Sequence, residues 1–271
     1  MFVDEILGDC SPGGAQPGSV TTEDALETLA LTNYGHFTTM RVHEGRVRGL
    51  TLHLDRLVRD CWLLFGCALD HEVVRQEIRA ALGGPEPMTV RVSVCNPAFS
   101  LVSPAKKGRP EVIVTTRPAC SEDLPPLRVR SAPYRRDVPA VKHAGLFGPL
   151  FERRQAQLAD YDDAVFMTDN GLLSEGVTWN LGFLDGDTLV WPAAEALPGV
   201  TAALLTTAHQ GPVRVEPVSL DRLPRMAAAF ATNSGTGVRA IGEIDGFTWS
   251  SEHPALATLR AEYATIEAEE V

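Results

Sequence analysis

The features best suited to carry out chemistry are a lysine, a glutamate and the start of a helix. All three lie within residues 139–201. Lys142 stands in Pro-Ala-Val-Lys-His-Ala-Gly, where small and apolar neighbours solvate it poorly. Desolvation lowers the pKa of an amine, so such a lysine can act as a nucleophile or a base. On spacing alone a surface lysine is the commoner interpretation. The only other lysines, Lys106 and Lys107, lie side by side in a polar Pro/Gly loop.

A carboxylate follows about thirty residues later. Glu175 lies in Ser-Glu-Gly after the turn Asp169-Asn170-Gly171, where it could face inward toward a cationic ring nitrogen. A buried carboxylate needs such a partner, because an unpaired buried charge is very costly. A surface glutamate before a strand is the alternative. Asn180 could orient this glutamate or cap a turn, and the sequence does not separate the two roles.

Two segments offer donors to an anion. Leu197-Pro-Gly-Val-Thr201 places Val200 and Thr201 at a helix start, where free backbone N–H groups and the helix dipole favour negative charge. Asn233-Ser-Gly-Thr-Gly237 offers hydroxyls and unhindered amides after an apolar strand, which suits a phosphate or a carboxylate. An ordinary helix start and a plain turn are the alternatives for these segments.

Strands and amphipathic helices must position these residues. Alternation predicts strands over 37–42, 88–94, 111–116 and 164–167, and hairpins around Gly45 and around Asp185-Gly186-Asp187. Apolar residues at three- and four-residue spacing predict a helix from Leu52 to Gly66, followed by helices at 72–82, 150–158, 200–210 and 219–226. The pattern indicates an α+β fold.

A Pro- and Ser-rich acidic segment over 117–126 indicates a linker. We therefore expect two α+β lobes, residues 1–122 and 123–271. The Gly-, Pro- and Ser-rich residues 1–22 are expected to form a loosely docked segment.

Composition narrows the class of protein. The chain has 271 residues, 44% apolar and 22% charged, with a formal charge of −11. This balance argues against nucleic-acid binding, which requires clustered Lys and Arg. The five cysteines are scattered without a CxxC pair, and the seven histidines are dispersed, so neither disulfides nor a metal site is expected. No apolar stretch reaches the roughly 18 residues of a membrane span, and we expect a cytoplasmic protein.

Taken together, these segments resemble the class IV aminotransferases, the pyridoxal-phosphate enzymes of fold type IV. That family includes branched-chain and D-amino acid aminotransferases and aminodeoxychorismate lyases. The resemblance runs from about Tyr34 to Gly246 and is carried by five segments in the family's order: 53–57, Lys142, 169–180, 197–201 and 232–235.

The resemblance implies pyridoxal 5'-phosphate as cofactor, held in the cleft between the lobes. Lys142 would form the Schiff base and shuttle the proton at the substrate α-carbon, and Glu175 would pair with the pyridine nitrogen. Arg56, Val200, Thr201 and Ser234 would hold the phosphate, with Asn180 lying behind Glu175 in the cofactor site. The family also implies a homodimer, which the sequence itself does not show.

The resemblance further implies that the substrates are an amino acid and an α-keto acid. Gly235 and Thr236 would lie where the substrate carboxylate is received. Arg91 and Arg41 are further candidates for binding this carboxylate, since arginine suits bidentate recognition, although strand arginines are as often structural.

Three positions bear on the reaction. Many relatives have a tyrosine five residues after the lysine, where this chain has Phe147, and an arginine where it has Ala202. The Lys142-His143 pair resembles the lyase branch. We therefore expect an aminotransferase. The alternatives are an enzyme that eliminates pyruvate, as aminodeoxychorismate lyase does, and a binding protein that has lost turnover. A hydrolase has little support, because no Gly-x-Ser-x-Gly elbow is present.

Overall fold

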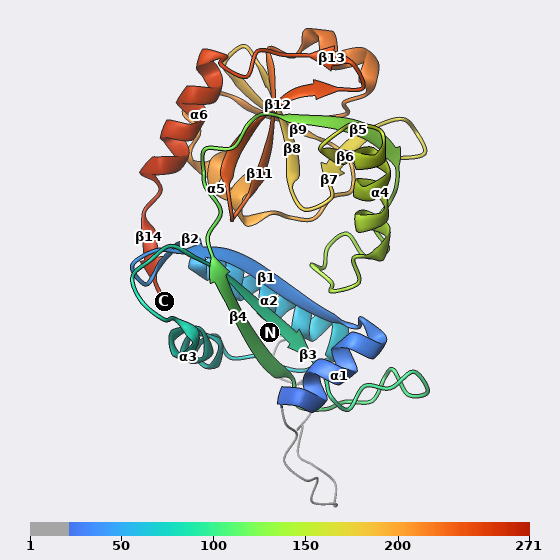
Figure 1. The fold of residues 1–271 in the computed structure, drawn as a ribbon, viewed down its shortest axis with the longest axis vertical. Coiled ribbons are helices and arrows are strands. Elements are labelled where there is room, and N and C mark those ends of the chain that lie inside the picture. The colour runs from blue at the N-terminus through green and yellow to red at the C-terminus, as the bar shows by residue number, and fades with distance from the viewer. Residues whose placement is uncertain (1–21) are drawn as a thin grey trace, which may run out of the picture.

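Two large β-sheets, each with its own helices, and a small sheet of β2 (Arg46–Arg48) and β14 (Ala268–Glu270) make up the fold of the described residues (Figure 1). The structure is a computed structural model that describes residues 22–271. The segment expected to be loosely docked therefore lies outside the described residues, except for Thr22. The C-terminal end of the chain lies beside the first sheet, because β14 pairs with β2.

The first sheet has the order β1-β3-β4 and is antiparallel throughout. The elements of this part are α1 (Thr22–Thr32), β1 (Gly35–Val42), β2 (Arg46–Arg48), α2 (Leu50–Phe65), α3 (His71–Ala81), β3 (Met88–Cys95) and β4 (Glu111–Pro118). Met40, Val90 and Val92 pack against Leu54 and Leu57 of α2. Since strand side chains alternate, the residues between them face the other side of the sheet.

The second sheet contains a closed ring of six strands in the order β8-β11-β12-β5-β6-β7, with β7 pairing back to β8. Its strands are β5 (Leu127–Pro133), β6 (Asp163–Met167), β7 (Leu173–Gly176), β8 (Asn180–Asp185), β9 (Thr188–Pro192), β10 (Val213–Glu216), β11 (Ala228–Asn233), β12 (Gly237–Ile244) and β13 (Phe247–Thr248). The pair that closes the ring is Glu175 opposite Asn180. Closure of the ring therefore fixes the relative positions of these two predicted site residues.

Helices cover the outside of the ring (Figure 1). They are α4 (Phe147–Leu158), α5 (Val200–Ala208), the 3-10 helix η1 (Leu220–Arg225) and α6 (Pro254–Thr265), after which β14 (Ala268–Glu270) completes the chain. Two apolar clusters fill this part, one around Phe183 and Ile241 and one around Phe230 and Leu205.

Most predicted elements are present with small shifts at their ends. Gly66 ends α2 in the left-handed conformation, φ 62°, as its position after the apolar run predicts. The hairpin predicted around Gly45 is different: a single bridge joins His43 to Arg46, and the ladder partner of β2 is β14. The α+β fold class is confirmed. The predicted boundary at residue 122 falls between β4 and β5, and the division into lobes stays a prediction.

Candidate active site

One cavity of about 340 Å³ lies between the two large sheets. Ten of the eleven predicted site residues line it. They come from separate parts of the chain: Arg56 from α2, Arg91 from β3, Lys142 from the loop before α4, Glu175 from β7, Asn180 from β8, Val200 and Thr201 from α5, and Ser234, Gly235 and Thr236 from the turn between β11 and β12. The eleventh, Arg41, does not line this cavity.

One end of the cavity is built to receive an anion. Helix α5 begins here without a side-chain cap, so the backbone N–H groups of its first turn are free to donate. The hydroxyls of Thr201 and Ser234 lie 3.2 Å apart beside it. Arg56 is buried, and its Nε has no hydrogen-bond partner among the described residues, nor has Thr232 Oγ1. Unpartnered buried donors, an open helix start and a guanidinium together fit a phosphate group.

Arg56 is held in place by its other contacts. Nη2 donates to Thr38 Oγ1 at 2.5 Å, and that hydroxyl is 2.7 Å from His53 Nδ1. Burial lowers the pKa of Arg56 to about 10, which leaves the guanidinium charged at neutral pH. His53, which belongs to the 53–57 segment, therefore supports the Arg56 guanidinium through the Thr38 hydroxyl. It does not line the cavity.

A glycine permits the close approach of α5 to the ring. A Cβ atom at Gly199 would lie 1.8 Å from Asn180 Oδ1, so only glycine fits between them. Asn180 Nδ2 donates to the carbonyl of Leu197 at 2.8 Å, which ties the helix start to β8. The structure thus places Asn180 as a support for the 197–201 segment as well as on the cavity wall.

Lys142 is partly buried and lies in the loop before α4. Its backbone is fixed on both sides: its N–H donates to Asp60 Oδ2 at 3.0 Å, and its carbonyl accepts from Phe37 N at 2.9 Å. Nζ lies 4.8 Å from the centre of the Phe37 ring. Burial lowers the pKa of the amine to about 7, with further lowering by the charges of Arg56 and Arg136. About half of the Lys142 amines are therefore neutral at pH 7.

Glu175 is buried and forms an ion pair with Arg136, whose Nε donates to Oε1 at 2.5 Å. The backbone N–H of Leu197 donates to the same oxygen at 3.2 Å. Burial raises the pKa of Glu175, while the charge and hydrogen bond of Arg136 oppose that rise. Arg136 stands in a run of charged residues without a periodic pattern, so no local signal indicated that it would be buried.

Arginines also line the side of the cavity formed by the first sheet. Arg91 stacks on the Phe37 ring with its Cζ atom 3.5 Å from the ring centre, and its Nε donates to Ser93 Oγ. Burial and the neighbouring charge of Arg117 lower the pKa of Arg91. Arg117 lines the same cavity and was not predicted; its alternation with Thr115 on β4 was the available signal.

The turn predicted to receive the substrate carboxylate has internal partners. Asn233 Oδ1 accepts from Gly235 N at 2.9 Å and from Thr236 N at 3.0 Å. Both amides already donate within the turn, so a carboxylate there would have to share or replace the Asn233 side chain. This arrangement is an Asx turn, which the Asn-Ser-Gly-Thr sequence permits.

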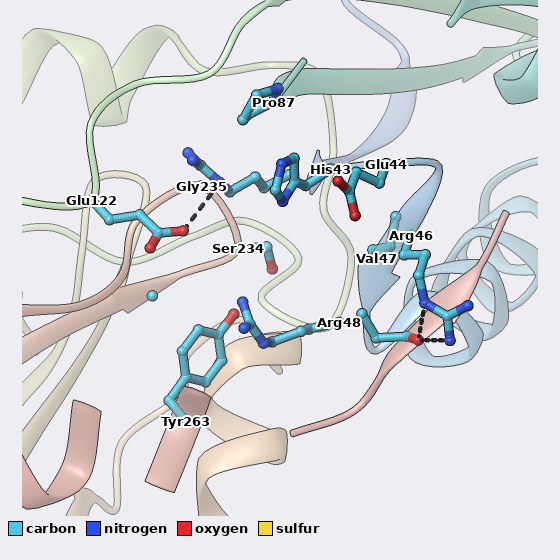
Figure 2. Close-up of a pocket in the computed structure, with 13 residues that line it drawn as sticks. His43, Glu44, Arg46, Val47, Arg48, Pro87, Glu122, Ser234, Gly235 and Tyr263 are labelled. Carbon is cyan, nitrogen blue, oxygen red and sulfur yellow. Dashed lines mark hydrogen bonds and ion pairs between the residues drawn. The ribbon is translucent and has the colours of Figure 1, made fainter. Parts of the chain in front are cut away.

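Arg41 instead lines a neighbouring cavity of about 380 Å³, which shares Ser234 and Gly235 with the first (Figure 2). Its Nε is 3.0 Å from Glu122 Oε1, the ion pair marked at Glu122 in the figure, and its Nη1 donates to the carbonyl of Cys120. Arg48 lies beside the Tyr263 ring in the same view. Arg41 was a candidate for binding the substrate carboxylate. It is thus already paired with a carboxylate of the chain itself.

Phe147 does not face the cavity. Its side chain is 84% exposed at the start of α4, and the neighbouring Leu146 lines the cavity in its place. The residue at the position where many relatives have a tyrosine is therefore turned toward the surface. Among residues 22–271, no tyrosine lines this cavity.

Comparison with known families agrees with the site. The sequence profile described as amino-transferase class IV matches residues 35–244. The chain belongs to this family. Class IV aminotransferases are pyridoxal-phosphate enzymes, and the match includes every predicted site residue. A protein from Methanocaldococcus jannaschii, provisionally named a branched-chain-amino-acid aminotransferase, is 25% identical over 78% of this chain and 79% of its own length.

Solved structures share the fold. The branched-chain aminotransferase of Escherichia coli superposes with a TM-score of 0.76 at 18% identity, over 88% of this chain and 87% of that one. The fold IV transaminase CpuTA1 from Curtobacterium pusillum gives 0.74 at 22% identity, over 87% and 85%. A Legionella pneumophila protein provisionally named a 4-amino-4-deoxychorismate lyase gives 0.76 at 23%, over 88% and 93%. At these identities the likeness establishes fold type IV.

Neither a metal-binding cluster nor a membrane-spanning helix is present in the described part of the chain. Residues 22–271 contain no cluster of three or more His, Cys, Asp or Glu side chains arranged to hold a metal ion. Within the same residues, no helix has the length and apolar character needed to cross a membrane.

Proposed function

We propose that this chain is a pyridoxal-phosphate-dependent aminotransferase that exchanges an amino group between an amino acid and an α-keto acid. One observation carries the proposal. A lysine whose pKa is lowered to about 7 lines one cavity together with an anion seat and a buried carboxylate. An amine, a phosphate seat and a partner for a ring nitrogen are the three groups that this cofactor requires.

The anion seat would hold the cofactor phosphate. Arg56 supplies charge and its unpartnered Nε, the α5 start supplies the Val200 and Thr201 amides, and Ser234 supplies a hydroxyl. When bound, the cofactor supplies an electron sink for the bond broken at the substrate α-carbon. Asn180 keeps the α5 start in position through Leu197.

Lys142 would attach the cofactor covalently and carry the proton at the α-carbon. Both roles need a neutral amine that can also hold a proton near neutral pH, which a pKa of about 7 provides. Glu175 lines the same cavity and would keep a ring nitrogen protonated through its negative charge. Leu146 and Phe37 exclude water beside the amine.

For the substrate carboxylate, Arg91 is the strongest candidate among the predicted residues. It lines the cavity, and no carboxylate among the described residues pairs with it. Gly235 and Thr236 remain predictions whose amides would have to leave Asn233. Arg41 would have to leave Glu122.

Pyruvate elimination from an aminated chorismate is the second candidate. It uses the same cofactor and lysine. The half-buried His143 next to Lys142, whose Nε2 has no hydrogen-bond partner among the described residues, is a candidate second proton carrier. The fold likeness to the Legionella pneumophila protein is compatible with this reaction.

We further propose a cytoplasmic homodimer. The exposed apolar side chains Phe147, Leu150 and Phe151 share one face of α4 next to the cavity, which suits burial against a second copy. Three cysteines of the described part, Cys61, Cys95 and Cys120, are free thiols, which suits a reducing compartment.

An absorbance spectrum with added pyridoxal phosphate tests the proposal. We expect a visible band that borohydride reduction removes, with the label on Lys142 by peptide mass spectrometry, and no such band in Lys142→Ala. Half-reactions with single amino acids then separate the two candidates, because only transamination leaves the cofactor aminated. A protein that stays colourless with excess pyridoxal phosphate would exclude both candidates.

A further inference from the structure

Arg136 and Glu175 form a buried ion pair at one wall of the cavity. Arg136 Nε donates to Glu175 Oε1, and Arg136 Nη2 reaches the carbonyl of Val177 at 3.4 Å. The N–H of Leu197 also donates to Oε1. Two donors thus occupy one carboxylate oxygen, and no described residue donates a hydrogen bond to the other. Oε2 is the oxygen left to meet a ligand.

The charge of Arg136 bears directly on the protonation of Glu175. Burial favours the neutral acid and raises the pKa of this carboxyl, and Arg136 is the main opposing influence. The other titratable groups that act on the pair are Lys142, which favours the carboxylate, and Tyr134, which directly follows β5. A neutral carboxylic acid could not stabilise a protonated ring nitrogen, because it carries no negative charge.

The pair also has a structural setting that must be separated from this role. Arg136 and Glu175 line both the main cavity and a second cavity of about 300 Å³ that contains Tyr134, Arg135 and Glu195. A substitution at Arg136 could therefore act simply by opening the wall between the two cavities. Arg135 offers a matched control, because its ion pair with Glu195 is exposed, with side chains 69% and 57% accessible.

We propose that Arg136 is a positioning residue that keeps Glu175 ionised and directs Oε2 into the cavity toward the ring nitrogen of the cofactor. The inference rests on the proposed function for the identity of the ring. The state of the carboxyl itself can be measured without it.

The first experiment follows the Glu175 carboxyl in the cofactor-free full chain. Infrared or ¹³C NMR spectra of glutamate-labelled protein are recorded against pH, with Glu175→Gln identifying the signal. In Arg136→Gln we expect the titration midpoint to rise by about one to three pH units, the range by which a neighbouring opposite charge moves a carboxyl pKa. Arg136→Lys keeps a charge with poorer geometry and should give a smaller rise. Arg135→Gln should titrate like the wild type.

The second experiment follows the ring nitrogen in protein loaded with ¹⁵N-labelled pyridoxal phosphate. We expect a protonated nitrogen in the wild type and in Arg135→Gln, and loss of that proton at pH 8 in Arg136→Gln. If the wild type takes up no cofactor, the proposed function fails while the carboxyl titration still tests the pair.

A Glu175 midpoint that does not rise in either Arg136 variant would overturn the inference, as would a ring nitrogen that stays protonated in Arg136→Gln. If Arg136→Gln does not fold, the Arg136→Lys titration decides alone. A rise there supports the electrostatic role, and a wild-type midpoint refutes it.

Discussion

The pKa of Lys142 gives a prediction that the chain can test with internal references. With a pKa of about 7, roughly half of the Lys142 amines are neutral at pH 7. An ordinary lysine with a pKa of about 10.4 is neutral in only about 1 of 2,500 molecules at that pH. The neutral fraction of Lys142 is therefore about a thousandfold larger, and it saturates above about pH 8.

Reductive methylation with a small aldehyde measures that fraction, because only the neutral amine reacts. The chain has three lysines, and the exposed Lys106 and Lys107 supply reference curves within the same sample. Peptide mass spectrometry of cofactor-free protein, labelled briefly from pH 6 to 10, gives the rate at each site. Since partial burial slows the reagent equally at every pH, the shape of the curve is compared rather than its height.

Removing a neighbouring charge should move that curve. The charge of Arg56 contributes to the low pKa of Lys142, second only to burial, so Arg56→Gln should shift its labelling curve to higher pH. Arg214→Gln removes an exposed arginine of the far strand β10, which pairs with Asp185. This substitution should leave the labelling curve of Lys142 unchanged. The reasoning is refuted if Lys142 follows the same pH curve as Lys106, or if Arg56→Gln has no effect.

Three further substitutions test the placement of other residues. Phe147→Tyr should leave the spectrum of bound pyridoxal phosphate unchanged, because Phe147 is exposed and Leu146 lines the cavity; a shifted band would contradict this. Gly199→Ala places a Cβ 1.8 Å from Asn180 Oδ1, so urea unfolding should show a loss of about 1–3 kcal/mol, and wild-type stability would rule out the clash. Ser234→Ala removes a hydroxyl from the phosphate seat and should weaken cofactor binding about tenfold by fluorescence titration, the effect of one hydrogen bond to a charged group; unchanged affinity would place the phosphate elsewhere.

Local patterns allowed the main elements and most site residues to be predicted. The α2 pattern, the Asp-Gly hairpin and the Gly-Val-Thr helix start each depend on neighbours in sequence, and each is present in the structure. Lys142 and Glu175 were found because both lie in short segments of unusual composition. Their meeting in one cavity depends on the closing pair Glu175–Asn180, which joins strands close in sequence.

Long-range contacts explain what the sequence could not give. Arg135 and Arg136 are adjacent arginines, yet one is exposed and the other is buried against Glu175, 39 residues away. The β2 partner likewise lies at the far end of the chain, in β14. In each case the deciding contact joins segments that no local pattern relates.

The charge of the cavity is opposite to that of the chain. The chain carries a formal charge of −11, but the cavity is lined by one carboxylate, Glu175, and by six cationic side chains: Arg56, Arg91, Arg117, Arg136, Lys142 and Arg153. Among residues 22–271, carboxylates pair with only two of these cations, Arg136 and Arg153. Arg91 and Arg117 are diagonal neighbours on one face of β3 and β4, where two unpaired guanidinium groups repel each other.

Anions from outside the described residues would relieve such repulsion, and a phosphate in the proposed seat would be one of them. A neutral second ligand would leave Arg91 and Arg117 without a counter-charge, whereas a carboxylate on the substrate would supply it. The same reasoning links the ligands to the amine. An anion paired with Arg56 removes part of the positive potential that lowers the pKa of Lys142, so phosphate binding favours the protonated amine. The protonation of Lys142 is thus coupled to the filling of the cavity, because the charges that bind the anions are the charges that act on the lysine.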